Sequence, residues 1–265
     1  MNKFHKICFI GGGAWGQALA ITLARIGYRS SILVSDPERA KIINENKSTC
    51  FKNLKYPNLI EASVEKSVLE KCDLAFISTE SFRVDNAVEI VHNISPESKL
   101  IITSKGFSNK QGDLFANTIN KNFPKKTFGI LTGPTFADEV ANNLPSAAII
   151  ASSNKSFSQN ICDLFSKSCL RLYLSDDPIG ACVSGAIKNI IAIGAGISDG
   201  LKLGDNAKAA FGGSSDLQIY HDGNHSHIVS NTGNLRILAD GSGSLVLTSK
   251  SGEEAITCAQ DGAVL

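Results

Sequence analysis

The sequence has no CxxC pair, no long hydrophobic segment and almost no net charge, and each absence excludes a class of protein. Its seven cysteines stand at long, irregular spacings, which argues against a disulfide framework and a zinc site and predicts reduced thiols in a cytoplasmic protein. No window reaches the length of a membrane span, and the apolar run near the N-terminus is too short for a signal peptide. The formal net charge of +1 gives no support for nucleic acid or a membrane as a partner.

Charge, proline and glycine are distributed unevenly along the chain. Residues 1–210 hold 24 Lys and Arg against 19 Asp and Glu, a net of +5, whereas residues 211–265 hold 2 against 6, a net of −4. All seven prolines lie at or before Pro178. Beyond residue 210, glycines separate the short alternating runs DLQIYHD, SHIVS, NLRILAD, SLVLTS and EAITCA. This pattern predicts a β-rich tail of small antiparallel strands over 211–265.

Short, continuously apolar runs alternate with helical patterns through the first part of the chain. They cover residues 5–10, 30–34, 73–78, 99–104, 128–133, 146–151 and 169–174. Continuous rather than alternating apolar strands indicate a parallel sheet covered on both faces. We therefore expect an α/β fold with a Rossmann-type, doubly wound, mostly parallel sheet, followed by a helical segment and the β-rich tail.

A glycine-rich sequence, GGGAWG, follows the first predicted strand and opens the first predicted helix. Gly11, Gly13 and Gly16 fit the pattern GxGxxG, in which the glycines permit a tight turn, close approach to a pyrophosphate and close packing of helix on strand. The helix N-terminus would then present N–H groups to the phosphates. This context predicts a dinucleotide site rather than a glycine turn without a ligand.

Asp36 ends the second predicted strand, where a carboxylate can hold a ribose 2′-hydroxyl, which favours NAD over NADP. However, Asp36 precedes Pro37 and can equally cap the helix that begins there. Arg39 lies near enough to neutralise a 2′-phosphate. The sequence therefore leaves the choice between NAD and NADP open.

Two further strand ends carry candidate binding residues. Lys105, just beyond a predicted strand, is either a ligand-binding residue at the carboxyl edge of the sheet or a solvated lysine. The sequence Gly133-Pro134-Thr135-Phe136-Ala137 also ends a strand and starts a helix, where Thr135 could cap the helix and exposed N–H groups could take a phosphate.

Lys188 lies in the apolar helical segment IGACVSGAIKNIIAIGAGI, which we expect to be a core helix. Lysine is rarely buried without a partner, and burial makes its proton easier to lose. Those properties suit a general acid or base for alcohol–ketone interconversion; the alternative is a lysine that extends to the helix surface. His221, His225 and His227 cluster in the tail, where we expect a solvated hairpin and no metal.

Together these residues resemble the bacterial NAD(P)-dependent sn-glycerol-3-phosphate dehydrogenase family. The resemblance runs from about Lys6 to Ala210 and rests on GGGAWG, SKGF, GPTFADEVA and GAIKNIIAIGAGISDGLKLGDNAKAA. It implies NAD or NADP as the cofactor and hydride transfer between its reduced form and dihydroxyacetone phosphate, giving sn-glycerol 3-phosphate. It further implies that Ala14, Trp15 and Ala137 contact the cofactor. Lys105, Gly133 and Thr135 would bind substrate, and Lys188 would be the proton donor and acceptor.

Residues 211–265 depart from that family and resemble the glycine-punctuated strand repeats of phage virion and tail-fibre proteins, with DLQIYHDG as the distinctive piece. We therefore expect a cofactor domain at 1–176, the truncated start of a helical substrate domain at 177–210, and a foreign tail at 211–265. Without the family's Ser-Arg-Asn-like phosphate clamp, turnover should be impaired. The alternative is an inactive nucleotide-binding remnant joined to a virion-type module. An uncovered helix face also predicts self-association.

Overall fold

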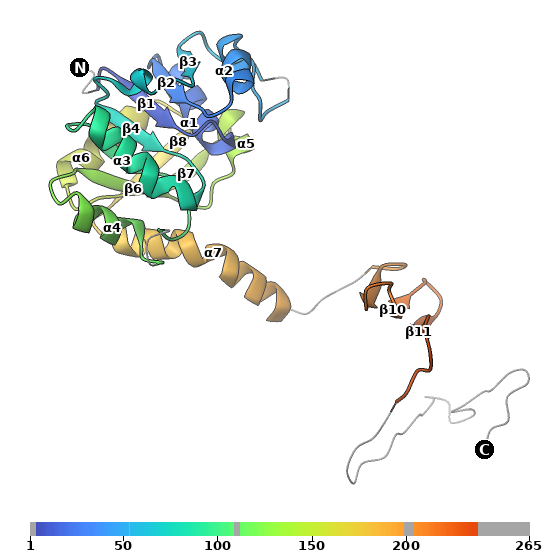
Figure 1. Ribbon diagram of the computed structural model, residues 1–265. Helices are drawn as coiled ribbons and strands as arrows, with labels where there is room; N and C mark the ends of the chain where they lie inside the picture. Colours follow the sequence, from blue (N-terminus) through green and yellow to red (C-terminus); the bar gives the residue numbers. More distant parts are fainter. Residues whose placement is uncertain (1–3, 53, 109–111, 199–203, 238–265) are drawn as a thin grey trace, which may run out of the picture. The chain divides into compact units, whose positions relative to one another are not determined.

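The computed structural model describes residues 4–52, 54–108, 112–198 and 204–237, which divide into two compact units, Met1–Gly194 and Ala195–Leu265 (Figure 1). The first unit contains an eight-stranded sheet of order β3-β2-β1-β4-β5-β6-β7-β8. Its strands are β1 (Ile7–Ile10), β2 (Ser30–Leu33), β3 (Ile60–Ser63), β4 (Leu74–Ile77), β5 (Lys99–Ile102), β6 (Phe128–Thr132), β7 (Ser146–Ala151) and β8 (Leu170–Ser175).

Neighbouring strands from β3 to β6 are parallel, β6 and β7 are antiparallel, and β7 and β8 are again parallel. The expected fold class, a Rossmann-type and mostly parallel sheet, is therefore confirmed. The sequence patterns predicted each of these strands except β3. That strand lies at the sheet edge, where only Ile60 and Ala62 of its four residues are buried, so it lacks a continuous apolar run.

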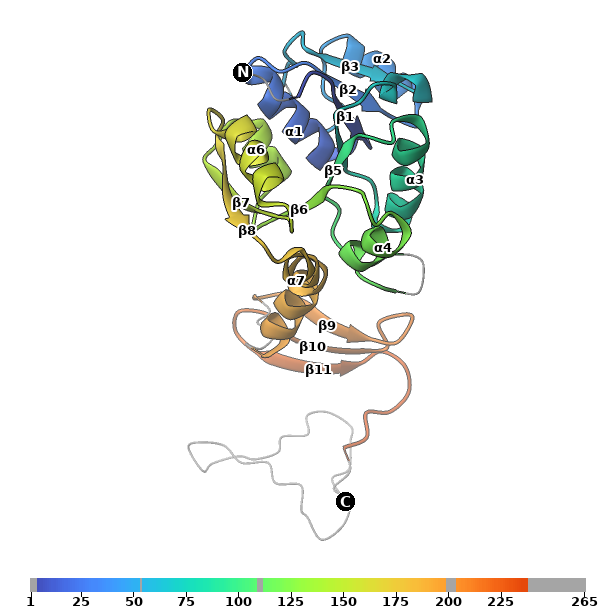
Figure 2. The same ribbon diagram turned by 90° about the vertical axis from the view of Figure 1, so that its left-hand side faces the viewer.

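Helices cover both faces of this sheet (Figure 2). They are α1 (Ala14–Arg25), α2 (Pro37–Asn44), α3 (Val84–Ile94), α4 (Phe115–Asn122), α5 (Ala137–Ala141), α6 (Lys155–Phe165) and α7 (Pro178–Ser198), with short 3₁₀ turns η1 (Lys66–Leu69) and η2 (Ser81–Arg83). Alternate residues of β1 serve the two faces. Ile7 and Phe9 belong to the core under α1, α5 and α6, whereas Cys8 and Ile10 belong to the core under α3 and α4. Two hydrophobic cores thus hold β1 at the centre of the unit.

Helix α7 is buried only near its start. Ala181 and Cys182 join the core under α3 and α4, but Ile190, Ile191 and Ile193 are 65%, 61% and 65% exposed. The expectation of a core helix throughout is therefore wrong for its later turns, which extend past the face of the sheet. In the part of the chain that is described, no single helix is long and apolar enough to cross a membrane. The pair Pro178–Lys188 and Ile190–Gly196, bent by 43°, meets that test by length and composition only.

The second unit contains a three-stranded antiparallel sheet of order β11-β10-β9, with β9 at Lys208–Phe211, β10 at Leu217–His221 and β11 at Ser226–Ser230. Tyr220 stacks on His227 with ring centroids 4.7 Å apart, and His227 Nε2 lies 2.8 Å from the Asp222 carboxylate. The strands expected in DLQIYHD and SHIVS are confirmed. Residues 234–237 of the run NLRILAD form no strand, and SLVLTS and EAITCA lie outside the described residues.

Strand β9 corrects one detail of the expected organisation. The helical pattern expected to about Ser198 agrees with α7, which ends at that residue. Ala210, expected at the end of the helical-domain segment 177–210, pairs with Gln218 inside the small sheet. The physical reason is that residues 208–211 find backbone partners on β10, so this stretch becomes an edge strand rather than the continuation of a helix.

Candidate functional site

The glycine loop joins β1 to α1 and meets the end of β4. Gly11 has φ of +106°, and a Cβ placed on it would lie 2.5 Å from the Ser78 carbonyl oxygen. A Cβ on Gly16 would collide with the Gly11 carbonyl, so helix and strand pack backbone to backbone. Gly13 differs, because an added Cβ would meet no heavy atom within 4 Å. The loop is thus tight on its protein side and open on the side where a dinucleotide phosphate would approach.

Gly12 is a residue that the sequence reasoning did not single out. A Cβ there would lie 2.5 Å from Val34 Cγ1 and 3.3 Å from Arg39 Cδ. Its carbonyl accepts hydrogen bonds from Gln17 Nε2 at 2.6 Å and from Arg39 Nη1 at 3.3 Å. The run of three glycines in the sequence was a signal for this position, whereas nothing in the sequence marked Gln17.

A groove of about 550 Å³ runs along the carboxyl ends of β1, β2 and β4. The glycine loop, including Ala14 and Trp15, forms one wall. The charged side chains along it are Arg39, Lys66, Glu80 and Arg83. This is the point at which the strand order reverses around β1, where open α/β sheets bind their ligands. The three cations give the groove a net positive charge suited to an anionic ligand.

Asp36 does not line this groove. Its side chain accepts a hydrogen bond from the Glu38 N–H at 3.0 Å and caps α2, with Pro37 in the first helical position. Of the two roles considered for Asp36, the structure shows the helix cap. The adjacent Ser35 lines the groove instead.

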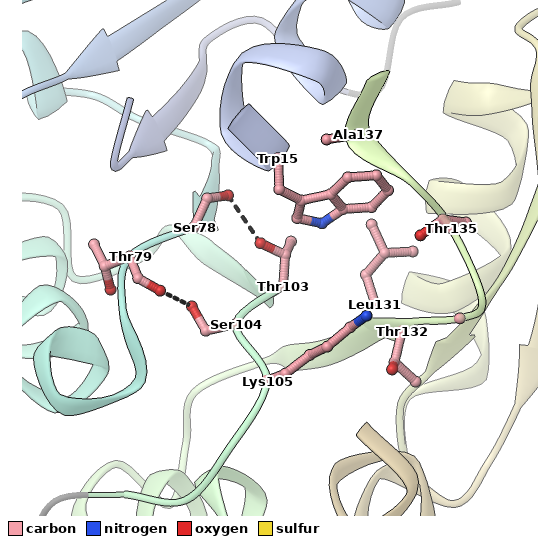
Figure 3. Close-up of a pocket in the computed structure, with 11 residues that line it drawn as sticks. Trp15, Ser78, Thr79, Thr103, Ser104, Lys105, Leu131, Thr132, Thr135 and Ala137 are labelled. Carbon is pink, nitrogen blue, oxygen red and sulfur yellow. Dashed lines mark hydrogen bonds between the residues drawn. The ribbon is translucent and has the colours of Figure 1, made fainter. Parts of the chain in front are cut away.

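A second pocket, of about 310 Å³, adjoins the groove through Trp15, Ser78 and Thr79, which line both (Figure 3). The sequence-predicted residues in its wall are Trp15, Lys105, Gly133, Thr135 and Ala137. The remaining wall residues were missed because they are ordinary Ser, Thr and Leu at strand ends: Ser78, Thr79, Thr103, Ser104, Leu131 and Thr132. The structure therefore brings together residues from the ends of β1, β4, β5 and β6.

Hydrogen bonds hold the ends of β4 and β5 in this wall. Ser78 Oγ and Thr103 Oγ1 are 2.9 Å apart, and Ser104 Oγ donates to the Thr79 carbonyl at 2.6 Å (Figure 3). The Thr79 hydroxyl is buried and has no protein hydrogen-bond partner among the described residues. A buried hydroxyl without a partner is costly unless a ligand or water satisfies it. Its position between groove and pocket fits a dinucleotide that passes from one to the other.

Gly133 and Thr135 have different local roles. A Cβ on Gly133 would lie 2.9 Å from Ala148 Cα, so packing against β7 requires this glycine. Thr135 does not cap α5, because the N-cap position is Phe136 and no side chain caps that helix. Helix capping, one of the two roles left open for this turn, is therefore not found, and the Thr135 hydroxyl lies at the pocket (Figure 3).

Lys188 lies on α7 near Lys105. Gly185 brings the helix close to the pocket, since a Cβ there would lie 3.1 Å from Thr132 Oγ1 and 3.9 Å from Lys105 Cγ. The pKa of Lys105 is lowered, first because the amine is partly withdrawn from water and second because Lys188 is a nearby like charge. Lys188 itself is exposed, so the expectation of a buried lysine is wrong for this structure. Its place beside the pocket, rather than burial, connects it to the site.

Replacing Lys188 by methionine should raise the pKa of Lys105 toward its ordinary value, because a neighbouring positive charge is removed. Partial burial should still keep that pKa below the ordinary value. The titration of ¹³C-labelled lysine methylene groups by NMR measures this shift. Lys121→Met on α4 is the matched control and should leave Lys105 unchanged; equal pKa values in all three proteins would contradict the proximity of the two amines.

Comparison with known proteins agrees with this arrangement. The curated glycerol-3-phosphate dehydrogenase [NAD(P)+] of Clostridium tetani is 37% identical over 212 residues, covering 77% of this chain and 60% of the relative. That of Hydrogenovibrio crunogenus is 33% identical over 230 residues, covering 84% and 67%. The crystal structure of glycerol-3-phosphate dehydrogenase from Coxiella burnetii superposes with a TM-score of 0.69 at 30% identity, covering 77% of this chain and 63% of that one. The chain thus spans about 60% of the length of the first curated relatives it matches.

Two family profiles match the chain. The profile described as NAD-dependent glycerol-3-phosphate dehydrogenase N-terminus matches residues 6–158, and the one described as NAD-dependent glycerol-3-phosphate dehydrogenase C-terminus matches residues 177–252. The second match continues past residue 210, where the family resemblance was expected to end. With more than half of its residues in the first match and the groove, pocket and glycine loop in place, the chain belongs to the NAD-dependent glycerol-3-phosphate dehydrogenase family.

Proposed function

We propose that this chain is an oxidoreductase that transfers hydride between NADH or NADPH and dihydroxyacetone phosphate, giving sn-glycerol 3-phosphate. The observation that carries the proposal is the continuity of a cationic, glycine-walled groove with a smaller pocket flanked by Lys105 and Lys188. The groove suits an anionic dinucleotide, and two lysines suit a phosphorylated ketone. Relatives bearing the name glycerol-3-phosphate dehydrogenase [NAD(P)+] support this assignment.

Held along the groove by the glycine loop, NADH or NADPH would supply the hydride that the C2 carbon of the ketone accepts. Lys188 donates a proton to the C2 oxygen, so that ketone plus hydride plus proton gives the alcohol. Lys105, Thr135 and the backbone at Gly133 hold the substrate in the pocket. Positive charge near the carbonyl oxygen stabilises the negative charge that develops there during hydride transfer. The reverse reaction uses neutral Lys188 as the proton acceptor.

We also propose that dinucleotide binding is retained better than turnover. Lys188 is exposed in the described structure, and electrostatic stabilisation is strongest where water is excluded. Residues 211–265 contain no Ser-Arg-Asn sequence that could clamp a phosphate. The virion-type origin of residues 211–265 and the cytoplasmic localisation of the chain remain predictions. Because the C-terminal family profile reaches residue 252, we do not propose a separate virion-type function.

The purified chain should oxidise NADH or NADPH slowly in a manner that depends on dihydroxyacetone phosphate. Lys188→Ala should lower that rate by about a hundredfold or more, because general acid catalysis typically contributes at least this much. Absorbance of the reduced nicotinamide measures the rate. Lys121→Ala, a change at an exposed lysine on α4, should keep the original rate. A wild-type rate no higher than that of Lys188→Ala would contradict the proposed reaction.

For the cofactor, we propose that Arg39 recognises the 2′-phosphate of NADP. Asp36 is engaged as a helix cap, while Arg39 lines the groove beside Ser35. Arg39→Ala should therefore raise the Kd for NADPH about tenfold more than the Kd for NADH, since a charge-assisted hydrogen bond is lost only with NADPH. Fluorescence titration with each cofactor measures the ratio, with Glu38→Ala as the control. Equal increases for the two cofactors would refute this role and leave Arg39 as support for Gly12 alone.

We further propose that the exposed face of α7 associates with a second copy of the chain. Ile190 and Ile193 lie one turn apart on that face and are both 65% exposed. Sedimentation velocity should detect oligomers that grow with protein concentration, and Ile190→Asp with Ile193→Asp should reduce them. Leu144→Asp, at an exposed leucine elsewhere, should not. A wild-type chain that remains monomeric at all concentrations would exclude this association.

A further inference from the structure

Gln17 is a fully buried polar residue in the first turns of α1, directly after the glycine loop. Its exposed fraction is 0%, and the side-chain amide contacts groups on two sides. Nε2 donates to the Gly12 carbonyl at 2.6 Å and to Thr49 Oγ1 at 2.7 Å, and Oε1 accepts from Ser48 Oγ at 3.2 Å and from the Tyr56 hydroxyl. A buried amide is tolerated only when it is satisfied in this way.

The chemistry of its partners determines which way the amide faces. The Gly12 carbonyl can only accept a hydrogen bond, so the atom beside it must be Nε2 and not Oε1. Tyr56 then donates to Oε1, and burial raises the pKa of its hydroxyl, which keeps that proton in place. Gln17 thereby joins the glycine loop to residues 48–50 and to Tyr56.

The bond to Gly12 also orients the next N–H group. Among the described residues no peptide bond is cis, so the Gly12 carbonyl and the Gly13 N–H point in opposite directions across a planar peptide. The buried Gln17 amide holds this carbonyl from the protein side, and Arg39 adds a longer bond of 3.3 Å. The Gly13 N–H therefore points away from the Gln17 amide. Gly13 itself lines the groove, and an added Cβ there would meet no heavy atom within 4 Å.

We propose that Gln17 is a positioning residue for dinucleotide binding, which fixes the Gly12–Gly13 peptide so that the Gly13 N–H faces the diphosphate of the cofactor. The inference rests on the cofactor part of the proposed function and goes beyond it, because it assigns a role to a side chain that does not touch the ligand. This role requires Gln17 Nε2 and the hydrogen bond that it donates to the Gly12 carbonyl.

Gln17→Met tests the proposal, since methionine is similar in shape and has no amide. The Kd for NADH should rise about tenfold, the loss expected when one hydrogen-bonding group is misplaced. Two controls lower stability without releasing the Gly12 carbonyl. Thr22→Val removes a buried bond from Thr22 Oγ1 to the Ala18 carbonyl on the same helix. Tyr56→Phe removes a hydroxyl that bonds Gln17 Oε1 and Ser48 and leaves the bond from Gln17 Nε2 to the Gly12 carbonyl in place. Both should keep the Kd within about twofold of the wild-type value.

Gln17→Glu provides a second variant that keeps the acceptor for Ser48 and Tyr56. The groups facing it are the Tyr56 hydroxyl, the Cys50 thiol and the Arg39 guanidinium that shares the Gly12 carbonyl. At about pH 8 an ionised carboxylate would repel that carbonyl and weaken NADH binding. At about pH 6 protonation would restore a donor, so the Kd should fall back toward the wild-type value.

Calorimetric titration with NADH and thermal unfolding without ligand give the two readouts. A Kd that rises in the Gln17 variants but not in Thr22→Val or Tyr56→Phe supports the proposal. A Kd that follows the loss of unfolding temperature across all four variants, or no binding of NADH by the wild-type chain, overturns it. Failure of dihydroxyacetone phosphate turnover with normal NADH binding counts against the proposed reaction alone, because no substrate enters this measurement.

Discussion

The close approach of bare backbone at the carboxyl end of β1 is the constraint on which the rest of the site depends. Gly11 touches the Ser78 carbonyl, and Gly16 touches the Gly11 carbonyl, so no side chain can separate β1, β4 and α1 there. Because the three elements meet at backbone distance, the strand ends behind them come within reach of one ligand. The groove, the shared wall at Trp15, Ser78 and Thr79, and the pocket beyond it all follow from this contact.

Much of the fold could be predicted from the sequence because buried parallel strands are continuous apolar runs. The runs at 7–10, 74–77 and 128–131 contain no polar side chain and are buried throughout, since cores lie on both faces of the sheet. Strand β3 has no such run, because it lies at the edge and needs only one apolar face. The strand at 208–211 was also missed, because its residues, KAAF, have little preference for β-structure and form a strand only by pairing with β10.

The residues of the candidate site could be predicted where a local sequence pattern marks them, and not where their role depends on contacts between distant parts of the chain. Glycine spacing and the lysine after β5 pointed to the groove and the pocket. The burial of Lys188 could not be judged from its apolar neighbours, because a helix that is apolar all round does not reveal where its packing partners end. Gln17 carried no local signal at all. Its partners Ser48 and Tyr56 are distant in sequence and meet it only in the folded unit.

The reversal of strand direction between β6 and β7 determines how α7 reaches the site. Ala181 in the core, Gly185 against Thr132 and Lys188 beside Lys105 are spaced four and then three residues apart, so they lie along one stripe of the helix. The helix thus separates the buried Ala181 from Lys188, beside the pocket, by about 10 Å along its axis. The number of residues also sets the direction of the side chain around the helix axis. One residue more or fewer between Ala181 and Lys188 would turn the amine by about 100° and point it away from Lys105. The placement of the Lys188 amine at the site therefore depends on the number of residues between Ala181 and Lys188, and not on how hydrophobic those residues are.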